Sequence, residues 1–452
     1  MSENSQPTNG AGLPAIDDPA LPRADAVAGI AHATPTDTAT DAGTTSFELP
    51  RIARALQHRD FRLFWAGNFL SNIGTWMQNV AQGWLVLQLT NSAFWLGMVG
   101  FASSIPILLF ALIGGVIADH VDKRKMLMVT QSAMMVFAFI MAGLTYFNRI
   151  TVHEIVLLAM GTGIAMSINT PTYQALVPQL VPREDLTNAI ALNSAQFNMS
   201  RVLGPTLGGI AMAAVGAAGN FFLNGLSFFA VILALKRIRY PQQEVRQEGR
   251  LWDKLKEGFV YAFSHPEMSQ LVVLVSIGSL LAIPYLTFIP YFAREILHTN
   301  ERGFGFLMAC SGAGAFLGAA TIAHIGRASN ANRLIFRSAA VFYACIILFT
   351  FSRSFYLSAL LLMAAGYSMI LMVATINTLL QHLAEDHMRG RVMSIYSTAF
   401  LGLPPIGSLM AGSLSHVFTA PHVIAGMAAV ALVASLFLLP KSGTSGPTTD
   451  LH

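Results

Sequence analysis

The feature that most constrains this chain is a repeated apolar block, about as long as a bilayer core is thick. Residues 126–147 and 218–235, for example, contain no charged residue. Roughly 20 apolar residues in a helix cross the hydrocarbon core of a membrane. Charged residues make up 11% of the 452-residue chain, whereas they make up about 25% of soluble domains. The sequence therefore predicts an all-α, polytopic membrane protein.

The apolar blocks predict twelve transmembrane helices, six on either side of a polar linker at 236–268. We expect spans near 61–88, 94–118, 126–147, 152–175, 189–215, 218–235, 269–297, 303–326, 334–352, 355–380, 392–415 and 421–440. The halves are then 51–235 and 269–440, around a central cavity. Residues 1–50 have few large apolar side chains, which is typical of a disordered tail, and 441–452 form a second tail.

The distribution of basic residues predicts the orientation, because cytoplasmic loops are enriched in Lys and Arg. Of the 27 Lys and Arg residues, four lie in the predicted outer loops, Arg201 lies inside a span, and the other 22 lie on the cytoplasmic side. We therefore expect both termini in the cytoplasm. Within the linker, Leu251, Leu255, Phe259 and Phe263 recur every four residues. This spacing predicts an amphipathic helix on the inner membrane surface, or a connector helix packed on the bundle.

The two halves match each other at one constant offset of 208 residues. Gly97 then corresponds to Gly305, and the tripeptide centred on Asn169 corresponds to the one centred on Asn377. Agreement at one offset in separate spans indicates a duplication. Transporters built from such repeats place their binding site between the halves, near the middle of the membrane.

This organisation resembles the major facilitator superfamily. The loop after the second predicted span carries Gly115, Asp119, Lys123 and Arg124, similar to the loop signature of that superfamily. His120 and Asp122 depart from it, where Arg and Gly are usual. The resemblance implies a gating role in which Asp119 pairs with a cation or a helix N-terminus. The alternative is ordinary cytoplasmic positive charge.

In the fifth predicted span, Gly204, Pro205, Gly208 and Gly209 resemble the core of a signature found in proton-coupled exporters of the same superfamily. Proline kinks a helix, and small residues let a neighbouring helix approach closely. The segment therefore predicts a pivot or seal, or simple helix packing. The resemblance of this segment favours export. Residues 61–78 and Arg201 also resemble the branch that contains enterobactin and drug exporters.

One face of the first predicted span is polar. Asn68, Asn72, Thr75, Asn79 and Gln82 follow steps of 4, 3, 4 and 3, which place all five on one side of a helix. Amides find no partner in lipid, so this face points inward. It lines a substrate cavity or bonds neighbouring helices. Trp76 is a candidate for stacking on a flat ligand, and further candidates are Asn169, Tyr173 and Asn377.

Arg201 is a charge placed deep in the membrane. It lies about 12 residues into its span, or roughly 18 Å at 1.5 Å per residue, near the middle of a 30 Å core. It therefore faces the bundle interior or a hydrated cavity, with Asn198 on nearly the same side. Either it recognises an anionic substrate, or it pairs permanently with Glu154 or backbone carbonyls.

The sequence shows no nucleotide-binding loop, no HExxH motif and no Cys/His metal cluster. We therefore expect no enzyme activity, cofactor, metal or nucleic-acid partner. The hypothesis is a monomeric secondary exporter of a siderophore or drug-like molecule in a bacterial-type inner membrane. It works by alternating access and proton antiport, with Asp119 or Glu154 carrying the proton. The alternatives are a lysolipid or metabolite importer and a non-transporting membrane sensor.

Overall fold

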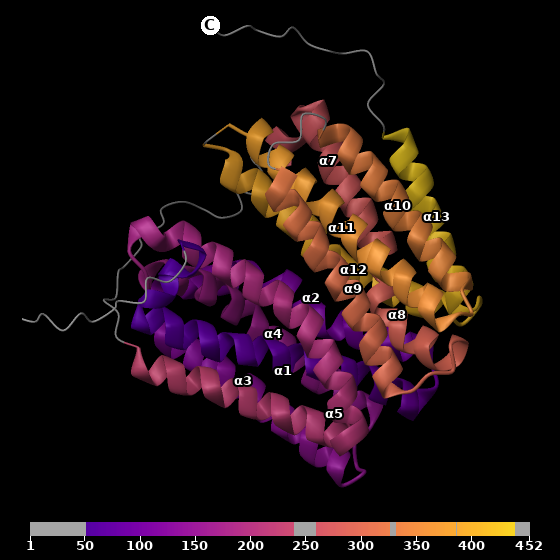
Figure 1. The fold of residues 1–452 in the computed structure, drawn as a ribbon, viewed down its shortest axis with the longest axis horizontal. Coiled ribbons are helices and arrows are strands. Elements are labelled where there is room, and N and C mark those ends of the chain that lie inside the picture. Colours follow the sequence, from indigo (N-terminus) through magenta and orange to yellow (C-terminus); the bar gives the residue numbers. More distant parts are fainter. Residues whose placement is uncertain (1–50, 239–258, 326–330, 386, 439–452) are drawn as a thin grey trace, which may run out of the picture. The chain divides into compact units, whose positions relative to one another are not determined.

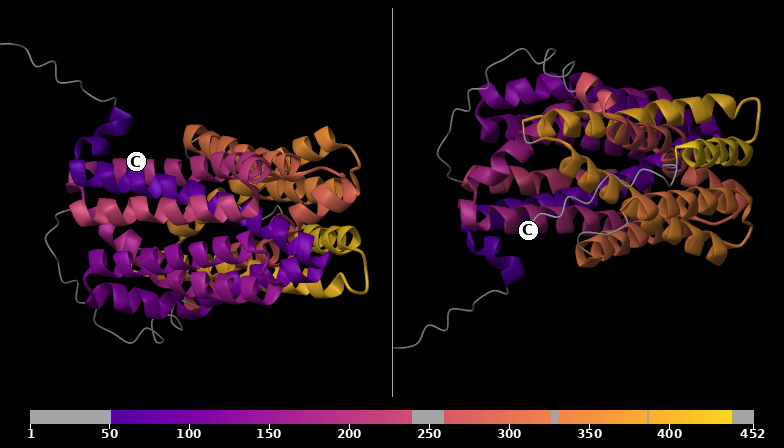
Figure 2. Two further views of the ribbon diagram at one scale, coloured as in Figure 1. Left: turned by 90° about the horizontal axis from the view of Figure 1, so that it is seen from below. Right: turned by 90° about the horizontal axis from the view of Figure 1, so that it is seen from above.

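The computed structural model describes residues 51–238, 259–325, 331–385 and 387–438, without the side chains of residues 51–53, 111–120 and 325. Every regular element in these residues is a helix, which confirms the all-α prediction. Figure 2 shows long helices packed side by side within each part of the bundle.

The N-terminal half contains five long helices (Figure 1). They are α1 (Arg59–Thr90), α2 (Ala93–His120), α3 (Lys123–Tyr146), α4 (Val152–Leu176) and α5 (Leu186–Arg237), with short helices η1 (Arg51–Gln57), η2 (Val177–Gln179) and η3 (Arg183–Asp185). α5 is 52 residues long but bends at Gly216, whose φ of 69° is non-helical. Glycine accepts this conformation without a Cβ clash. The bend separates the predicted spans 189–215 and 218–235.

The C-terminal half begins with a segmented helix. It comprises α7 (Pro266–Ile277), η4 (Gly278–Ala282), α8 (Tyr285–Tyr291) and η5 (Phe292–Ile296), where η4 and η5 are π-helical turns. Pro284 separates η4 from α8, and Pro290 lies inside α8 just before η5. Proline lacks the backbone N–H that a regular α-helix requires. There follow α9 (Glu301–Ile325), α10 (Ala331–Phe351), α11 (Phe355–Leu383), α12 (Arg389–Leu414) and α13 (Ala420–Phe437).

Ten segments of the described residues are long and apolar enough to cross a membrane. One of them, Arg183–Arg237, contains both arms of the bent α5, and α1 is not among the ten. The five polar residues on one face of α1 lower its hydropathy. The chain is therefore a polytopic membrane protein, and the count of twelve crossings stays a prediction. The boundaries of the two halves stay a prediction too, and most of the proposed linker helix lies outside the described residues.

Glycines at the contacts between the halves bring backbones close together. A Cβ on Gly97 of α2 would overlap the carbonyl oxygen of Ser408 in α12, and a Cβ on Gly305 of α9 would lie 2.7 Å from the carbonyl oxygen of Pro205 in α5. The two glycines that the repeat offset pairs therefore serve equivalent contacts, α2 with α12 and α5 with α9. Both contacts lie near the N-termini of α2 and α9, which is the predicted outer end.

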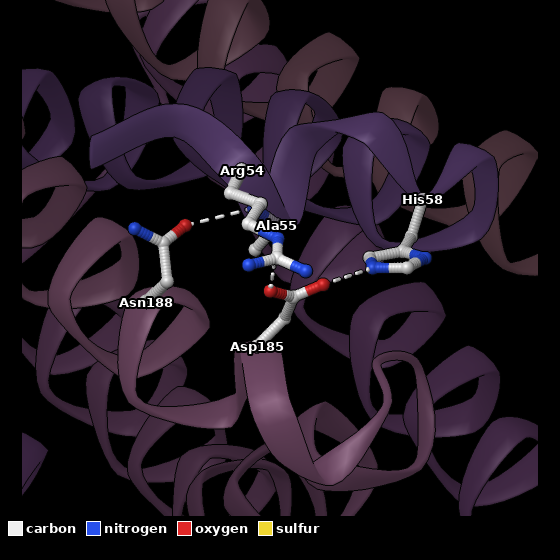
Figure 3. Close-up of polar contacts among 5 residues, drawn as sticks. All are labelled: Arg54, Ala55, His58, Asp185 and Asn188. Atoms are coloured by element: carbon white, nitrogen blue, oxygen red, sulfur yellow. Dashed lines mark hydrogen bonds and ion pairs between the residues drawn. The ribbon is translucent and has the colours of Figure 1, made fainter. Parts of the chain in front are cut away.

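A polar cluster fastens η1 to the start of α5 at the opposite end of α1 (Figure 3). The carboxylate of Asp185 lies 3.0 Å from Nε of Arg54 and 2.7 Å from Nε2 of His58. The backbone N–H of Ala55 donates to the side chain of Asn188 at 2.8 Å. Asp185 is buried, so its charge is neutralised by partners at the surface, as buried carboxylates require.

Candidate functional site

A cavity of about 460 Å³ lies between the two halves. The N-terminal half contributes Trp76, Asn79 and Gln82 from α1, and Arg201 from α5. The other half contributes mainly apolar and small residues, including Thr287, Phe304, Met308, Met369, Phe400, Pro404, Pro405 and Ser408. The cavity is therefore mainly apolar and contains a few polar groups, the usual composition of a small-molecule site.

Arg201 and Trp76 are in direct contact at this wall. The guanidinium carbon of Arg201 lies 5.9 Å from the centre of the Trp76 ring, within the range of a cation–π interaction. Phe197, one helical turn before Arg201, meets the same ring edge-on at 6.3 Å. Gly204 makes the approach possible, because a Cβ there would overlap Cβ of Trp76.

Arg201 has no acidic partner among the described residues. It forms no ion pair there, and it is the one charged side chain among the described residues that line this cavity. Glu154 is engaged elsewhere, since its carboxylate accepts the backbone N–H of Thr151 at 2.6 Å and caps α4. The positive charge of Arg201 therefore faces the cavity without a counter-ion in the described part of the protein.

A second cavity of about 230 Å³ adjoins the first within the N-terminal half. Asn68, Asn72 and Thr75 of α1 line it, together with Asn169 of α4. The two cavities share four lining residues, Asn79, Gln82, Ser103 and Ser104. All five members of the predicted polar face of α1 thus line the second cavity, and Asn79 and Gln82 line both cavities.

The amides of this wall are held in place by buried hydrogen bonds. The side-chain oxygen of Asn169 accepts from Oγ1 of Thr130 at 3.0 Å and from Nε2 of Gln131 at 3.2 Å. The side chain of Asn224 in α5 donates to that of Gln78 in α1 at 2.7 Å. Such bonds fix the orientation of the wall, because a buried amide without a partner is costly.

Three predicted cavity residues do not line either of these two cavities. Tyr173 packs against Phe64, with ring centres 5.3 Å apart, Asn198 donates to the carbonyl of Ser194 in its own helix, and Asn377 accepts from Gln381. The repeat partners Asn169 and Asn377 therefore have different surroundings, although the sequence offset pairs them.

Sequence reasoning missed the contribution of α2, α8 and α12. Ser103 and Ser104 form a polar pair in an otherwise apolar span, and Pro404 and Pro405 form a double proline in another. Both were visible signals of a wall that is not simply lipid-facing. The hydroxyls of Thr287 and Ser408 lie 3.2 Å apart, a contact that no spacing in the sequence indicates.

The glycines of the GPTLGG segment face two different helices. A Cβ on Gly208 would lie 3.0 Å from Cα of Met77 in α1, and one on Gly209 would lie 2.9 Å from the carbonyl oxygen of Glu301 in α9. Pro205 supplies the carbonyl that Gly305 approaches. This segment is therefore packed against α1 on one side and across the boundary between the halves on the other.

The loop after α2 is described in part. Gly115 and Asp119 belong to α2, but their side chains lie outside the described residues. Lys123 is buried at the start of α3, and the side chain of Asp122 caps that helix by accepting from the backbone N–H of Arg124. The Arg124 guanidinium donates to the carbonyl of Lys236 at 2.9 Å and so joins α3 to the end of α5. The gating role of these residues stays a prediction.

Comparisons with known proteins find a family and several relatives. Residues 53–445 match the family model described as transmembrane secretion effector. The chain is 24% identical over 359 residues to a staphyloferrin A transporter of Staphylococcus aureus, covering 79% of this chain and 90% of that protein. It is 24% identical over 374 residues to the multidrug efflux pump Tap of Mycolicibacterium fortuitum (80% and 88%). It is 23% identical over 363 residues to an enterobactin exporter of Citrobacter koseri (80% and 86%).

Solved structures share the fold at low identity. A nucleoside transporter superposes with a TM-score of 0.66 at 13% identity, covering 84% of this chain and 98% of that one. A bacterial homologue of the iron transporter ferroportin, in an inward-facing state, superposes with a TM-score of 0.64 at 16% identity (85% and 99%). At these identities the likeness concerns the fold alone.

Proposed function

We propose that this chain is a secondary active exporter of a small organic anion. The proposal starts from its membership of the transmembrane secretion effector family, which consists of membrane transporters of the major facilitator superfamily. The substrate is a siderophore or a drug-like molecule of comparable charge. Export proceeds by alternating access across a bacterial inner membrane, with both termini in the cytoplasm and protons as the counter-ion.

The single observation that carries the proposed substrate class is Arg201 at the wall of the 460 Å³ cavity. Its charge lies beside Trp76 and lacks an acidic partner in the described residues. A guanidinium in an environment poor in water binds a planar anion, such as a carboxylate, through paired hydrogen bonds. Trp76 adds a flat surface, and Asn79 and Gln82 add neutral donors and acceptors.

The proposed transport cycle uses the contacts between the halves as a gate. The close approaches of Gly97 to Ser408 and of Gly209 to α9 hold the halves together near the predicted outer end. Release to the outside requires these backbones to separate while the cytoplasmic end closes. The loop residues Asp119, Lys123 and Arg124 lie at that opposite end and are the proposed inner gate.

Proton coupling is proposed on different grounds from the substrate class. It follows from the resemblance of the GPTLGG segment to proton-coupled exporters, and Asp119 and Glu154 are the proposed carriers. The carboxylate of Glu154 is half-buried at the first turn of α4 and bonded to the backbone of Thr151. Protonation of Glu154 would weaken this cap, because the neutral acid is a poorer acceptor for an N-terminal amide. The charge of Glu154 therefore affects how firmly the N-terminus of α4 is capped.

The test is transport into inside-out membrane vesicles energised by respiration. We expect accumulation of an anionic siderophore, with enterobactin and staphyloferrin A as the probes, and loss of accumulation when a protonophore is added. The cation ethidium serves as the comparison substrate, and we expect it to accumulate at least tenfold less, because Arg201 repels it.

Three outcomes would contradict this proposal. Movement of the probes in the opposite direction would indicate an importer. Transport of a lysolipid, but of neither siderophore, would assign a different substrate. The absence of flux in proteoliposomes under any ion gradient would indicate a sensor without transport activity.

A further inference from the structure

A third cavity, of about 390 Å³, lies in the C-terminal half, away from the substrate wall. It is a groove between α9, α10 and α11, lined by residues such as Gly314, Leu317, Arg337, Val341 and Tyr367. It shares no lining residue with either of the cavities described above. Its function is therefore separate from the proposed substrate path.

The floor of the groove is formed by close packing of α9 on α11. A Cβ on Gly314 would overlap the carbonyl oxygen of Met363, and one on Gly318 would lie 2.7 Å from the carbonyl oxygen of Tyr367. The two helices touch along their backbones, so their side chains leave a depression that α10 borders. The groove is thus built into the helix packing.

The walls of the groove face the membrane. Leu317 is 50% exposed and Val341 is 48% exposed, and both belong to segments that are long and apolar enough to cross a bilayer. In a membrane, apolar side chains at such positions are in contact with acyl chains. The occupant of this groove therefore has a hydrocarbon part.

One charge is set in this apolar surface. Arg337 is exposed and is the one charged residue among the described residues that line the groove. It forms no ion pair in the described part of the chain. The only acidic residue of α9, α10 and α11 is Glu301, in the first turn of α9. The groove therefore has a net positive charge with no internal compensation.

The position of Arg337 matches the depth of a lipid headgroup. It lies six residues after Ala331, the first residue of α10, or about 9 Å along the helix. A long arginine side chain reaches from this depth to the membrane interface while its methylene groups stay in lipid. Val341, one turn deeper, lies at acyl-chain level. The groove thus offers a cation at the interface and an apolar slot beneath it.

We propose that this groove is a binding site for one anionic phospholipid. The phosphate of the lipid pairs with the guanidinium of Arg337, and an acyl chain lies along Leu317 and Val341. Basic pockets between transmembrane helices at the cytoplasmic side bind anionic headgroups in this way. A zwitterionic lipid offers the same chains but no net charge, so it binds more weakly.

The experiment measures lipid retention by the full-length protein. The protein is purified from membranes, supplied with phosphatidylglycerol or phosphatidylcholine, and analysed by native mass spectrometry and thermal unfolding. We expect one tightly held phosphatidylglycerol and a higher midpoint of unfolding. The Arg337→Gln variant is expected to bind this lipid about fivefold more weakly, as the loss of one cation at a membrane surface predicts.

Two further variants separate the groove from general charge effects. Arg353→Gln removes another exposed arginine, which does not line the groove, and it is expected to behave as the wild type. Leu317→Trp fills the slot and keeps the charge, and it is expected to lose the bound lipid as well. Equal lipid retention in wild type and Arg337→Gln would overturn the proposal. So would equal protection by phosphatidylcholine or by inorganic phosphate.

Discussion

At the scale of single residues, Arg201 determines the proposed chemistry. A charge at mid-membrane is expensive, and it is retained where it faces a cavity or a partner. Among the described residues its guanidinium lies over Trp76 and lines the cavity, and it forms no ion pair. Glu154 does not form an ion pair with Arg201 in the structure, because its carboxylate caps α4. Arg201 is therefore available for a ligand.

Replacement of Arg201 tests this directly. Arg201→Ala is expected to reduce anion export by at least tenfold, with normal expression and an unchanged unfolding temperature. Arg201→Lys keeps the charge but loses the planar fork, so we expect an intermediate rate through a higher KM. The rates are measured in inside-out vesicles at matched protein content. Normal transport by Arg201→Ala would remove this residue from the site.

At the scale of elements, α5 combines a bend with a sealing surface. Its arms meet at Gly216, and the preceding arm presents Gly208 to α1 and Gly209 to α9. The bend turns the chain between two spans without a loop. The φ of 69° and ψ of −178° lie in a region that is essentially restricted to glycine. The element therefore depends on one residue for its geometry.

Gly216→Ala is expected to lower stability by about 1–3 kcal/mol, the cost of forcing a side-chain residue into this region. No atom from outside the adjoining chain lies within 4 Å of the added Cβ, so we expect the loss to come from backbone strain. Gly426→Ala in α13 is the control, because that glycine also has open space but helical geometry, and it is expected to show no loss. Thermal unfolding in detergent measures both. An unchanged midpoint for Gly216→Ala would refute the strain argument.

At the scale of the whole molecule, the halves meet through backbone contacts placed at equivalent repeat positions. Gly97 and Gly305 serve the α2–α12 and α5–α9 contacts, respectively. Two contacts of this kind close the predicted outer end together, so a change at one of them acts on the entire bundle. The proposed alternating access requires such an arrangement, since transporters of this kind open by moving one half against the other.

A reversible cross-link tests this motion. A Cβ on Gly100 would lie 3.8 Å from Cβ of Ser408, a typical separation for a disulfide. Gly100→Cys with Ser408→Cys, in a background where Cys310 and Cys345 are replaced by Ala, is expected to lose transport on oxidation and regain it on reduction. Each single variant is the control for its own substitution. Full activity of the oxidised pair would exclude an opening at this contact.

The sequence by itself determined the class of the protein and the polar face of α1 that lines the second cavity. Apolar block length specifies membrane helices, and a 4-3-4-3 spacing places five polar side chains on one face whatever the helix packs against. The apolar blocks also predicted separate spans at 189–215 and 218–235, and the structure has the bend at Gly216 between them. These are local properties, since helix geometry relates neighbours in sequence to neighbours in space.

Only the tertiary structure decided which polar residues reach the cavity. Asn169 and Asn377 are equivalent in sequence, yet Asn169 is held by Thr130 and Gln131 at the wall of the second cavity, whereas Asn377 bonds Gln381 in its own helix. The opposite wall, with Thr287 and Ser408, and the lipid-facing groove at Arg337 were also decided there. The physical reason is that a cavity is the space left between several helices, and its lining depends on the rotation and approach of each of them.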